Sequence, residues 1–160
     1  MKSNKIFGKK PIQFTVKGKP PQKSEWGEKN ASLVIDLRKA ALKARIDAGF
    51  SDCIKTPVKL TLEVYATNPD KMDYRQKGDD DEEKYSGDLD SMIAGVCDYL
   101  SRSKEEPGRN NFVPSTLFDE AREVYPTIKI LIEDDSLIQI INAKKMVSEK
   151  PYYVVTLELI

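Results

Sequence analysis

VKLTLEVYAT, residues 58–67, is the stretch of sequence that decides the fold. Its apolar side chains at Val58, Leu60, Leu62 and Val64 alternate with polar or amphipathic ones. A period of two places successive side chains on opposite faces of a β-strand, so that one face lies in a core and the other meets solvent. The sequence therefore predicts a half-buried strand, and the other elements are placed around it.

Two stretches have apolar residues at helical spacing and are predicted to form the main helices. The first covers residues 33–48 and is followed by Gly49, a residue type that commonly terminates helices. The second covers residues 89–100, and Asp88 stands at its N-cap position. The apolar stripe of the second helix is predicted to pack on the sheet.

Three further strands and a short helix complete the predicted fold. The strands cover residues 12–16, 136–146 and 152–160, and the short helix runs from Thr116 to Val124. The element order β-α-β-α-(short α)-β-β predicts an α+β, or mixed α/β, fold with one mixed β-sheet and two main helices.

The chain is expected to be a single domain over residues 1–160, with a basic N-terminal arm at 1–11 and a flexible acidic loop at 68–87. Its 26 Lys and Arg residues balance its 26 Asp and Glu residues, but the charges are unevenly placed. Residues 1–23 hold seven lysines and no acid, whereas residues 79–90 hold seven acids and one lysine. The first segment favours phosphate and the second favours cations, although a solvated surface is the simpler interpretation of either.

The chain contains no histidine. This excludes Ser-His-Asp and Cys-His catalysis and every imidazole metal site, so carboxylates, lysines, tyrosines or metal-bound water must carry any proton chemistry. The two cysteines, Cys53 and Cys97, are too few for a disulfide framework. No apolar stretch reaches the length of a signal peptide or a membrane span, so we expect a cytoplasmic protein.

Asp88-Leu89-Asp90, at the start of the second predicted helix, is the first candidate metal site. Free N–H groups and the helix dipole stabilise carboxylates at a helix N-terminus. Two hard oxygen donors at such a point suit Mg²⁺, which binds a few carboxylates together with water and phosphate oxygens. Ordinary helix capping is the competing interpretation of both acids.

A second acidic group, Glu133-Asp134-Asp135, comes directly before the apolar residues of the strand predicted at 136–146. Because successive strand side chains point to opposite faces, only one of Asp134 and Asp135 is expected to face a metal ion. The pattern alone does not choose between them, and a solvated loop is the alternative for the whole group.

Three blocks of the sequence, taken in order, resemble the RusA family of Holliday junction resolvases, the crossover junction endodeoxyribonucleases of bacteria and prophages. The blocks are residues 12–22, a strand followed by a Gly-Lys-Pro loop; residues 87–100, similar to an Asp-x-Asp-Asn helix that continues to Asp-x-Leu; and residues 132–138, similar to an Asp-Asp-Ser/Ala-Gln-Ile/Val block. Lys145 follows the third block where the family usually has a lysine.

The resemblance implies a Mg²⁺-dependent endonuclease, with Mn²⁺ as an alternative ion, that acts as a homodimer on four-way or otherwise branched DNA in recombination and repair. It implies that Asp88, Asp90 and Asp135 bind the metal, and a phage or prophage origin is expected. Lys145 is the candidate catalytic lysine. The candidate DNA-binding residues are Lys17, Lys19, Lys23, Lys84 and Lys144.

The sequence departs from the family pattern at three places. Ser91 stands where the family has Asn, Ala94 stands where it has a catalytic lysine, and residues 101–131 form a long connection. A lysine at position 94 would lie one helical turn after the second Asp of the motif and could neutralise charge on a phosphate. We expect Lys144 or Lys145 to supply that charge instead.

Two other functions fit the same residues. The protein could be a catalytically weakened or inactive module that binds branched DNA, with Ala94 marking the lost activity. It could also be a structural or interaction protein whose aspartates only cap helices. Mg²⁺-dependent cleavage of a junction would distinguish the enzyme from both.

Overall fold

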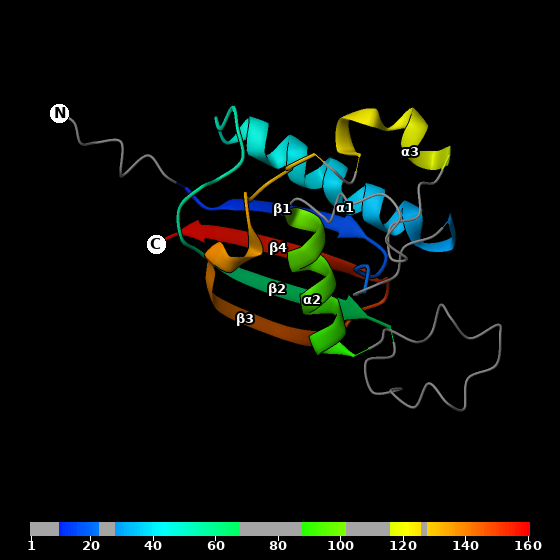
Figure 1. Cartoon of the computed structure of the whole chain (residues 1–160). Helices are drawn as coiled ribbons and strands as arrows, with labels where there is room; N and C mark the ends of the chain where they lie inside the picture. Colours follow the sequence, from blue (N-terminus) through cyan, green and yellow to red (C-terminus); the bar gives the residue numbers. More distant parts are fainter. Residues whose placement is uncertain (1–9, 23–27, 68–87, 102–115, 126–127) are drawn as a thin grey trace.

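The computed structural model describes residues 10–22, 28–67, 88–101, 116–125 and 128–160 (Figure 1). The acidic loop, most of the basic arm, Lys23 and Lys84 lie outside the described residues. The predictions made for those segments therefore stay predictions.

Four strands form one mixed sheet in the order β1-β4-β2-β3 (Figure 1). They are β1 (Ile12–Lys17), β2 (Val58–Ala66), β3 (Ile138–Val147) and β4 (Tyr152–Leu159). Strand β4 runs antiparallel to both β1 and β2, whereas β2 runs parallel to β3. The predicted α+β fold with a mixed sheet is confirmed.

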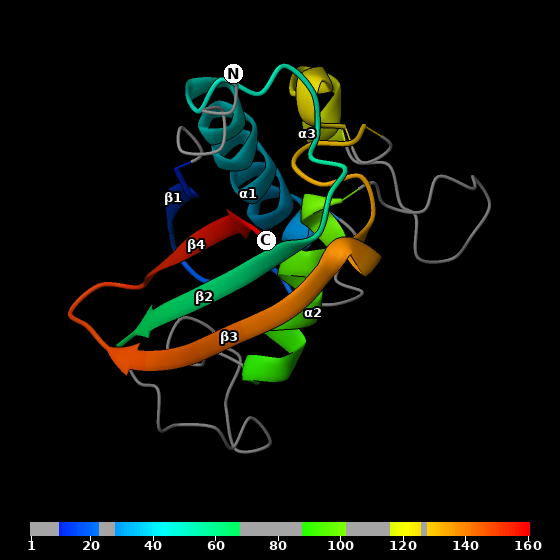
Figure 2. The same cartoon turned by 90° about the vertical axis from the view of Figure 1, so that its left-hand side faces the viewer.

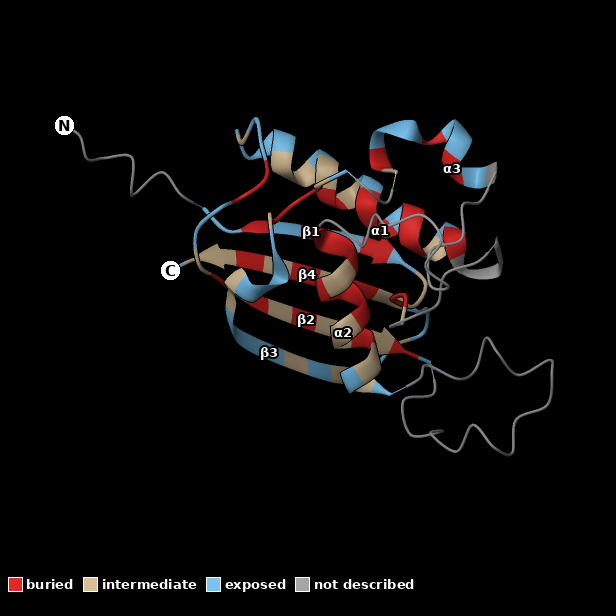
Figure 3. Cartoon of the chain, viewed as in Figure 1, coloured by how far each residue is buried: buried red, intermediate tan, exposed pale blue. Residues whose placement is uncertain are grey.

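The two main helices, α1 (Glu28–Asp47) and α2 (Leu89–Leu100), lie on one face of this sheet (Figure 2). Alternate residues of β2 are buried beneath them, and the residues between are only partly buried, as the period of two predicts (Figure 3). Gly49 follows α1 with a φ of +93°, a conformation that suits glycine at the end of a helix. The core lies between the helices and this one face of the sheet.

Three short helical elements complete the fold: α3 (Thr116–Glu120), η4 (Arg122–Val124) and η5 (Asp135–Leu137). The helix predicted from Thr116 to Val124 is split, because Ala121 has the non-helical angles φ −117° and ψ 53°. The strand predicted to begin at residue 136 begins at Ile138, because the residues before it form the turn η5. None of the described helices has the length and hydropathy needed to cross a membrane.

Arg38 of α1 is fully buried and connects this helix to the C-terminal end of α2. Its guanidinium group donates hydrogen bonds to five backbone carbonyls, those of Tyr99 (2.6 Å), Ser101 (3.2 Å), Val124 (2.9 Å), Tyr125 (2.8 Å) and Ile128. The first two acceptors lie at the end of α2, where helix carbonyls have no partner within the helix. Arg38 thereby fixes where α2, η4 and the chain after η4 meet.

Candidate functional site

Asp88 and Asp90 lie exposed at the N-terminal end of α2. Asp88 occupies the N-cap position with φ −77° and ψ 137°, but among the described residues its side chain makes no capping hydrogen bond. The Asp90 carboxylate accepts a hydrogen bond of 2.9 Å from the backbone N–H of the next residue, Ser91. Capping therefore does not account for the Asp88 carboxylate, which is open to a ligand beside the positive end of the helix dipole.

The Gly18–Gln22 loop crosses α2 one turn beyond these acids. Gly18 has a φ of +91°, which favours glycine and turns the chain out of β1. A Cβ atom built on Gly95 of α2 would lie 2.2 Å from the carbonyl oxygen of Pro21, so the loop backbone and the helix touch there. Lys19, which is half-exposed, is thus held on a segment that rests on α2.

Replacement of Gly95 by alanine is expected to lower the free energy of unfolding by about 1–3 kcal/mol, the usual cost of overpacking. Without the Pro21 contact the same change would stabilise a helix by about 1 kcal/mol, so the sign of the effect tests the contact. Denaturant unfolding measures it. A stabilised Gly95→Ala protein would show that the loop does not rest on α2 at this point.

Lys145 lies on the helix-bearing face of β3. It is in register with Val64 of β2, and paired residues on neighbouring strands point to the same face. Val64 is buried beneath the helices, and α2 packs against β3. Lys144 points to the opposite face, where its Nζ atom lies 3.8 Å from Oε2 of Glu63. Of the two lysines expected to compensate for Ala94, only Lys145 shares a face with α2.

Two of the predicted lysines, Lys17 and Lys145, lie near one end of the sheet. Helix α2 packs against β3 and begins on the side toward which β2 and β3 run (Figure 1). Lys17, the last residue of β1, is in register with Tyr152, and Tyr152 is in register with Tyr65 near the end of β2. Lys145 lies close to the same end because Tyr65 is paired with Met146. Because Tyr65 lies on the face of Glu63, opposite the buried Val64, the register places Lys17 on the face away from α2. Of these two lysines, only Lys145 shares the face of α2.

Asp134 and Asp135 have different roles in the turn η5. The Asp134 carboxylate accepts a hydrogen bond of 2.9 Å from the backbone N–H of Ser136 and so caps the turn. Partial burial raises the pKa of Asp135, and its hydrogen bond with Asp134 and the negative charge of Asp98 raise that pKa further. Because Asp98 belongs to α2, Asp135 is the member of the pair that faces this helix.

The three predicted metal ligands do not form one group within the described subunit. No three Asp, Glu or Cys side chains among the described residues are placed to hold a metal ion together. Asp98, the neighbour of Asp135, follows Asp90 by eight residues, which corresponds to about 12 Å of helix rise. Asp88 and Asp90 are therefore one candidate site, and Asp98 with Asp135 form a second carboxylate pair farther along α2.

Asp98 is the residue near the site that the sequence prediction left without a role. Its signal is a spacing of four residues, since Asp90, Ala94 and Asp98 follow one another along one side of α2. Cys97 beside it is buried, and burial together with the Asp135 and Asp98 carboxylates raises the pKa of its thiol to about 12. That thiol is protonated at neutral pH and packs in the core.

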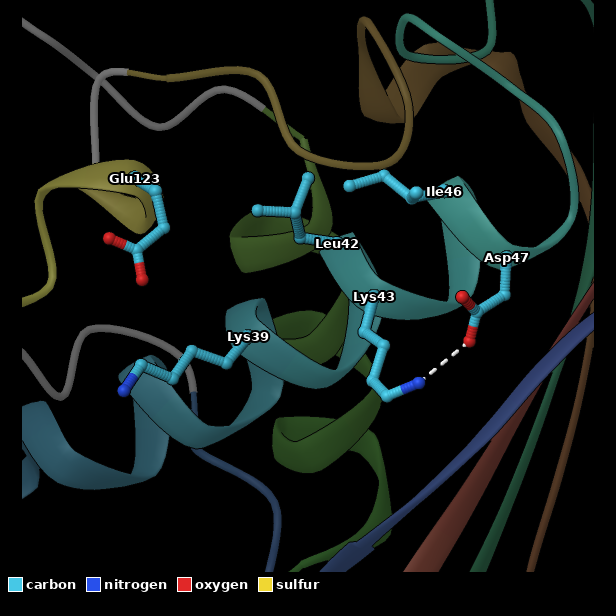
Figure 4. A pocket seen from close by; sticks show the side chains of 6 residues that line it. All are labelled: Lys39, Leu42, Lys43, Ile46, Asp47 and Glu123. Carbon is cyan, nitrogen blue, oxygen red and sulfur yellow. Dashed lines mark hydrogen bonds and ion pairs between the residues drawn. The ribbon is translucent and has the colours of Figure 1, made fainter.

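A shallow hollow of ≈ 260 Å³ lies elsewhere, between α1 and η4 (Figure 4). Leu42 and Ile46 line it, and Lys43 and Asp47 form an ion pair of 2.8 Å at its rim. Its volume is below the range of small-molecule sites. It contains none of the residues predicted to bind metal or DNA.

The start of α2 is thus the place where two exposed carboxylates lie, with Lys145 on the same face of the sheet. No protein-family model matches the chain, and no curated protein matches it significantly. The chemistry of Asp88, Asp90 and the neighbouring lysines is consequently the basis on which a function can be argued.

Proposed function

We propose that this protein is a Mg²⁺-dependent endonuclease that cleaves branched DNA, in the manner of the RusA-like Holliday junction resolvases that its sequence resembles. The observation that carries the proposal is the exposed Asp88 carboxylate, which is not used as a cap and lies two residues before Asp90 at the N-terminus of α2. A purely structural N-cap would use that carboxylate to bind backbone N–H groups.

Asp88 and Asp90 are the residues proposed to bind the metal. Their oxygens are the hard donors that Mg²⁺ or Mn²⁺ takes, and one or two carboxylates with water and phosphate oxygens are a common ligand set for Mg²⁺. When bound, the ion supplies a water of lowered pKa and positive charge beside the scissile phosphate. Asp135 is retained as the third ligand on the strength of the sequence resemblance alone.

The lysines are proposed to hold and polarise the DNA backbone. Lys145, on the same face as α2, is assigned the charge that Ala94 lacks, and Lys19 is assigned to a phosphate that flanks the cleavage point. Lys17, Lys23, Lys84 and Lys144 are proposed as further DNA contacts. Two symmetric cuts in a four-way junction favour a homodimer with one such site in each subunit. A role in recombination or repair, a cytoplasmic location and a phage or prophage origin complete the proposal.

A four-way junction labelled on one strand tests this function directly. We expect symmetric nicks at the junction when Mg²⁺ is added, no cleavage in EDTA, and little cleavage of a linear duplex of the same sequence. Mn²⁺ in place of Mg²⁺ is expected to support cleavage as well. Absence of metal-dependent cleavage on any branched substrate would reject the enzyme.

A binding module without catalysis is the second candidate, and the specific observation in its favour is Ala94. A gel shift with the same junction in EDTA separates the two remaining possibilities. Junction binding without cleavage supports the module, whereas absence of both leaves a structural or interaction protein.

A further inference from the structure

Strand β3 is an edge strand with unusual exposure. Its outer edge has no partner strand among the described residues, and it is the longest of the four strands at ten residues. Ile140 and Ile141 are 46% and 44% exposed although they point to opposite faces, and Val147 is 72% exposed. The other edge strand, β1, instead alternates cleanly between buried and exposed residues. Long edges with apolar side chains are templates for pairing with another strand.

The backbone groups that β3 presents at this edge can be identified. The N–H of Ser148 donates a hydrogen bond to the carbonyl of Ala66 in β2, so Ser148 directs its backbone groups inward. Orientation alternates along a strand, and the register between β2 and β3 is unbroken from Ile140 to Val147. Ile141, Ala143 and the other odd-numbered residues of this stretch therefore direct their N–H and C=O groups away from β2.

A second copy of this chain fits this edge better than a helix would. A helix would cover one face of β3 and leave either Ile140 or Ile141 in water, whereas an added strand covers both faces and pairs the outward N–H and C=O groups. In an antiparallel pair related by a two-fold axis, outward residues must stand opposite outward residues. Only a few registers of β3 against itself meet that condition.

The charges and the apolar side chains of β3 together favour one of these registers. An axis at Lys144 or Lys145 would place each of those lysines directly opposite its own copy, which is unfavourable. An axis at Ala143 places Ile141 opposite Lys145 and Ile140 opposite Met146, so the aliphatic lysine stem covers an isoleucine. Lys144 then stands opposite Asn142, and its charge is already offset by Glu63, 3.8 Å away.

We propose that two copies of the chain dimerise by antiparallel pairing of β3 with β3 about a two-fold axis at Ala143, giving one continuous eight-stranded sheet. This inference deepens the proposed homodimer, on which it rests, by naming the surface that forms it. Figure 2 shows β3 as the outermost strand, with both main helices on one side of the sheet. The two copies of α2 would lie on the same side of the joined sheet.

Cysteine cross-linking tests the register. Two copies of residue 143 would have Cα atoms about 5.5 Å apart, within the range of a disulfide. Oxidised Ala143→Cys protein is expected to run mainly as a covalent dimer. Ile141→Cys is the matched control, because its two copies would be about 14 Å apart along the strands. Cys53 and Cys97 are buried and do not compete.

Two aspartate substitutions test the same axis without cysteine cross-linking. Ala143→Asp places two carboxylates opposite each other and is expected to weaken dimerisation at least tenfold, measured by analytical ultracentrifugation. Ile141→Asp introduces the same charge two residues away but opposite Lys145, so it is expected to retain the dimer. Unfolding of both variants in denaturant controls for a folding defect.

The outcomes separate this pairing from the nuclease activity. Cross-linking of Ala143→Cys but not Ile141→Cys, with loss of the dimer only in Ala143→Asp, establishes the pairing even if no junction is cleaved. A dimer that is indifferent to all four substitutions overturns it and leaves another surface as the interface. A wild-type protein that is monomeric at micromolar concentration, with or without DNA, also overturns it and indicates that a segment of its own chain covers the edge.

Discussion

Replacement of Asp90 by asparagine is expected to reduce Mg²⁺-dependent cleavage of a four-way junction by on the order of 10³-fold, and replacement of Asp88 by asparagine is expected to do the same. A carboxylate that helps to hold the ion supports several kcal/mol of transition-state stabilisation, and each ~1.4 kcal/mol is a factor of ten in rate. Junction binding in EDTA should change little, because the lysines proposed to contact phosphates are intact. Single-turnover cleavage and a gel shift give the two measurements.

Unfolding in denaturant shows whether these two variants have lost stability as well as activity. The Asp88 side chain makes no capping hydrogen bond among the described residues, so Asp88→Asn should unfold at nearly the wild-type denaturant concentration. Asp47→Asn, at the other end of the helical layer, is the matched control for loss of an exposed carboxylate and should cleave normally. Full activity in both Asp88→Asn and Asp90→Asn would remove the start of α2 from the catalytic site.

Asp135→Asn answers a separate question in the same assay. Within one subunit Asp135 lies near Asp98, and no group of three acids surrounds a cation position among the described residues. A loss as large as that of Asp90→Asn would place the Asp135 carboxylate on the same ion in the working enzyme. An unchanged rate would restrict the metal site to the two acids of α2.

The strands and main helices could be predicted because their side chains repeat with the period of their backbone. The alternation that starts at Val58 corresponds to β2, and the stripe that starts at Leu89 corresponds to α2. The conformation of residues 135–137 is harder to predict, because the side chain of Asp134 can cap a turn here and the turn competes with an extended strand. The hydrogen bond of 2.9 Å from Ser136 to Asp134 favours the turn, and the hydrophobic pattern of the sequence does not predict it.

The candidate site could be predicted only as far as local geometry determines it. The spacing of Asp88 and Asp90 places both at one helix end, whereas the position of Asp135 depends on how η5 packs against α2. The face of Lys145 follows from the strand register, which depends on the parallel partner β2 and not on β3 alone. From the sequence alone, Gly95 is an unfavourable residue for a helix interior. The structure explains its presence, because a side chain there would clash with the backbone of a loop more than seventy residues earlier.

Arg38 is the residue whose loss is expected to destabilise the fold most. Burial lowers the pKa of its guanidinium to about 9, so the group stays charged at neutral pH. Five backbone carbonyls satisfy that charge in place of a carboxylate, and they belong to the end of α2 and to the chain around η4. The sequence around position 38 does not indicate this role. Every acceptor is a backbone carbonyl, and backbone carbonyls are present at every residue regardless of its type.

Arg38→Met is therefore expected to lower the free energy of unfolding by about 3 kcal/mol or more, since it leaves several buried carbonyls without a donor. For a domain of this size that corresponds to a fall in Tm of roughly 6–12 °C. Arg38→Lys should recover only part of the loss, because an ammonium group has three donors at one point and cannot span the acceptors. Lys43→Met, on the exposed side of the same helix, controls for helix propensity and should leave the Tm nearly unchanged. An Arg38→Met protein as stable as wild type would mean that water or another donor satisfies those carbonyls, and that α2 is held by its apolar stripe alone.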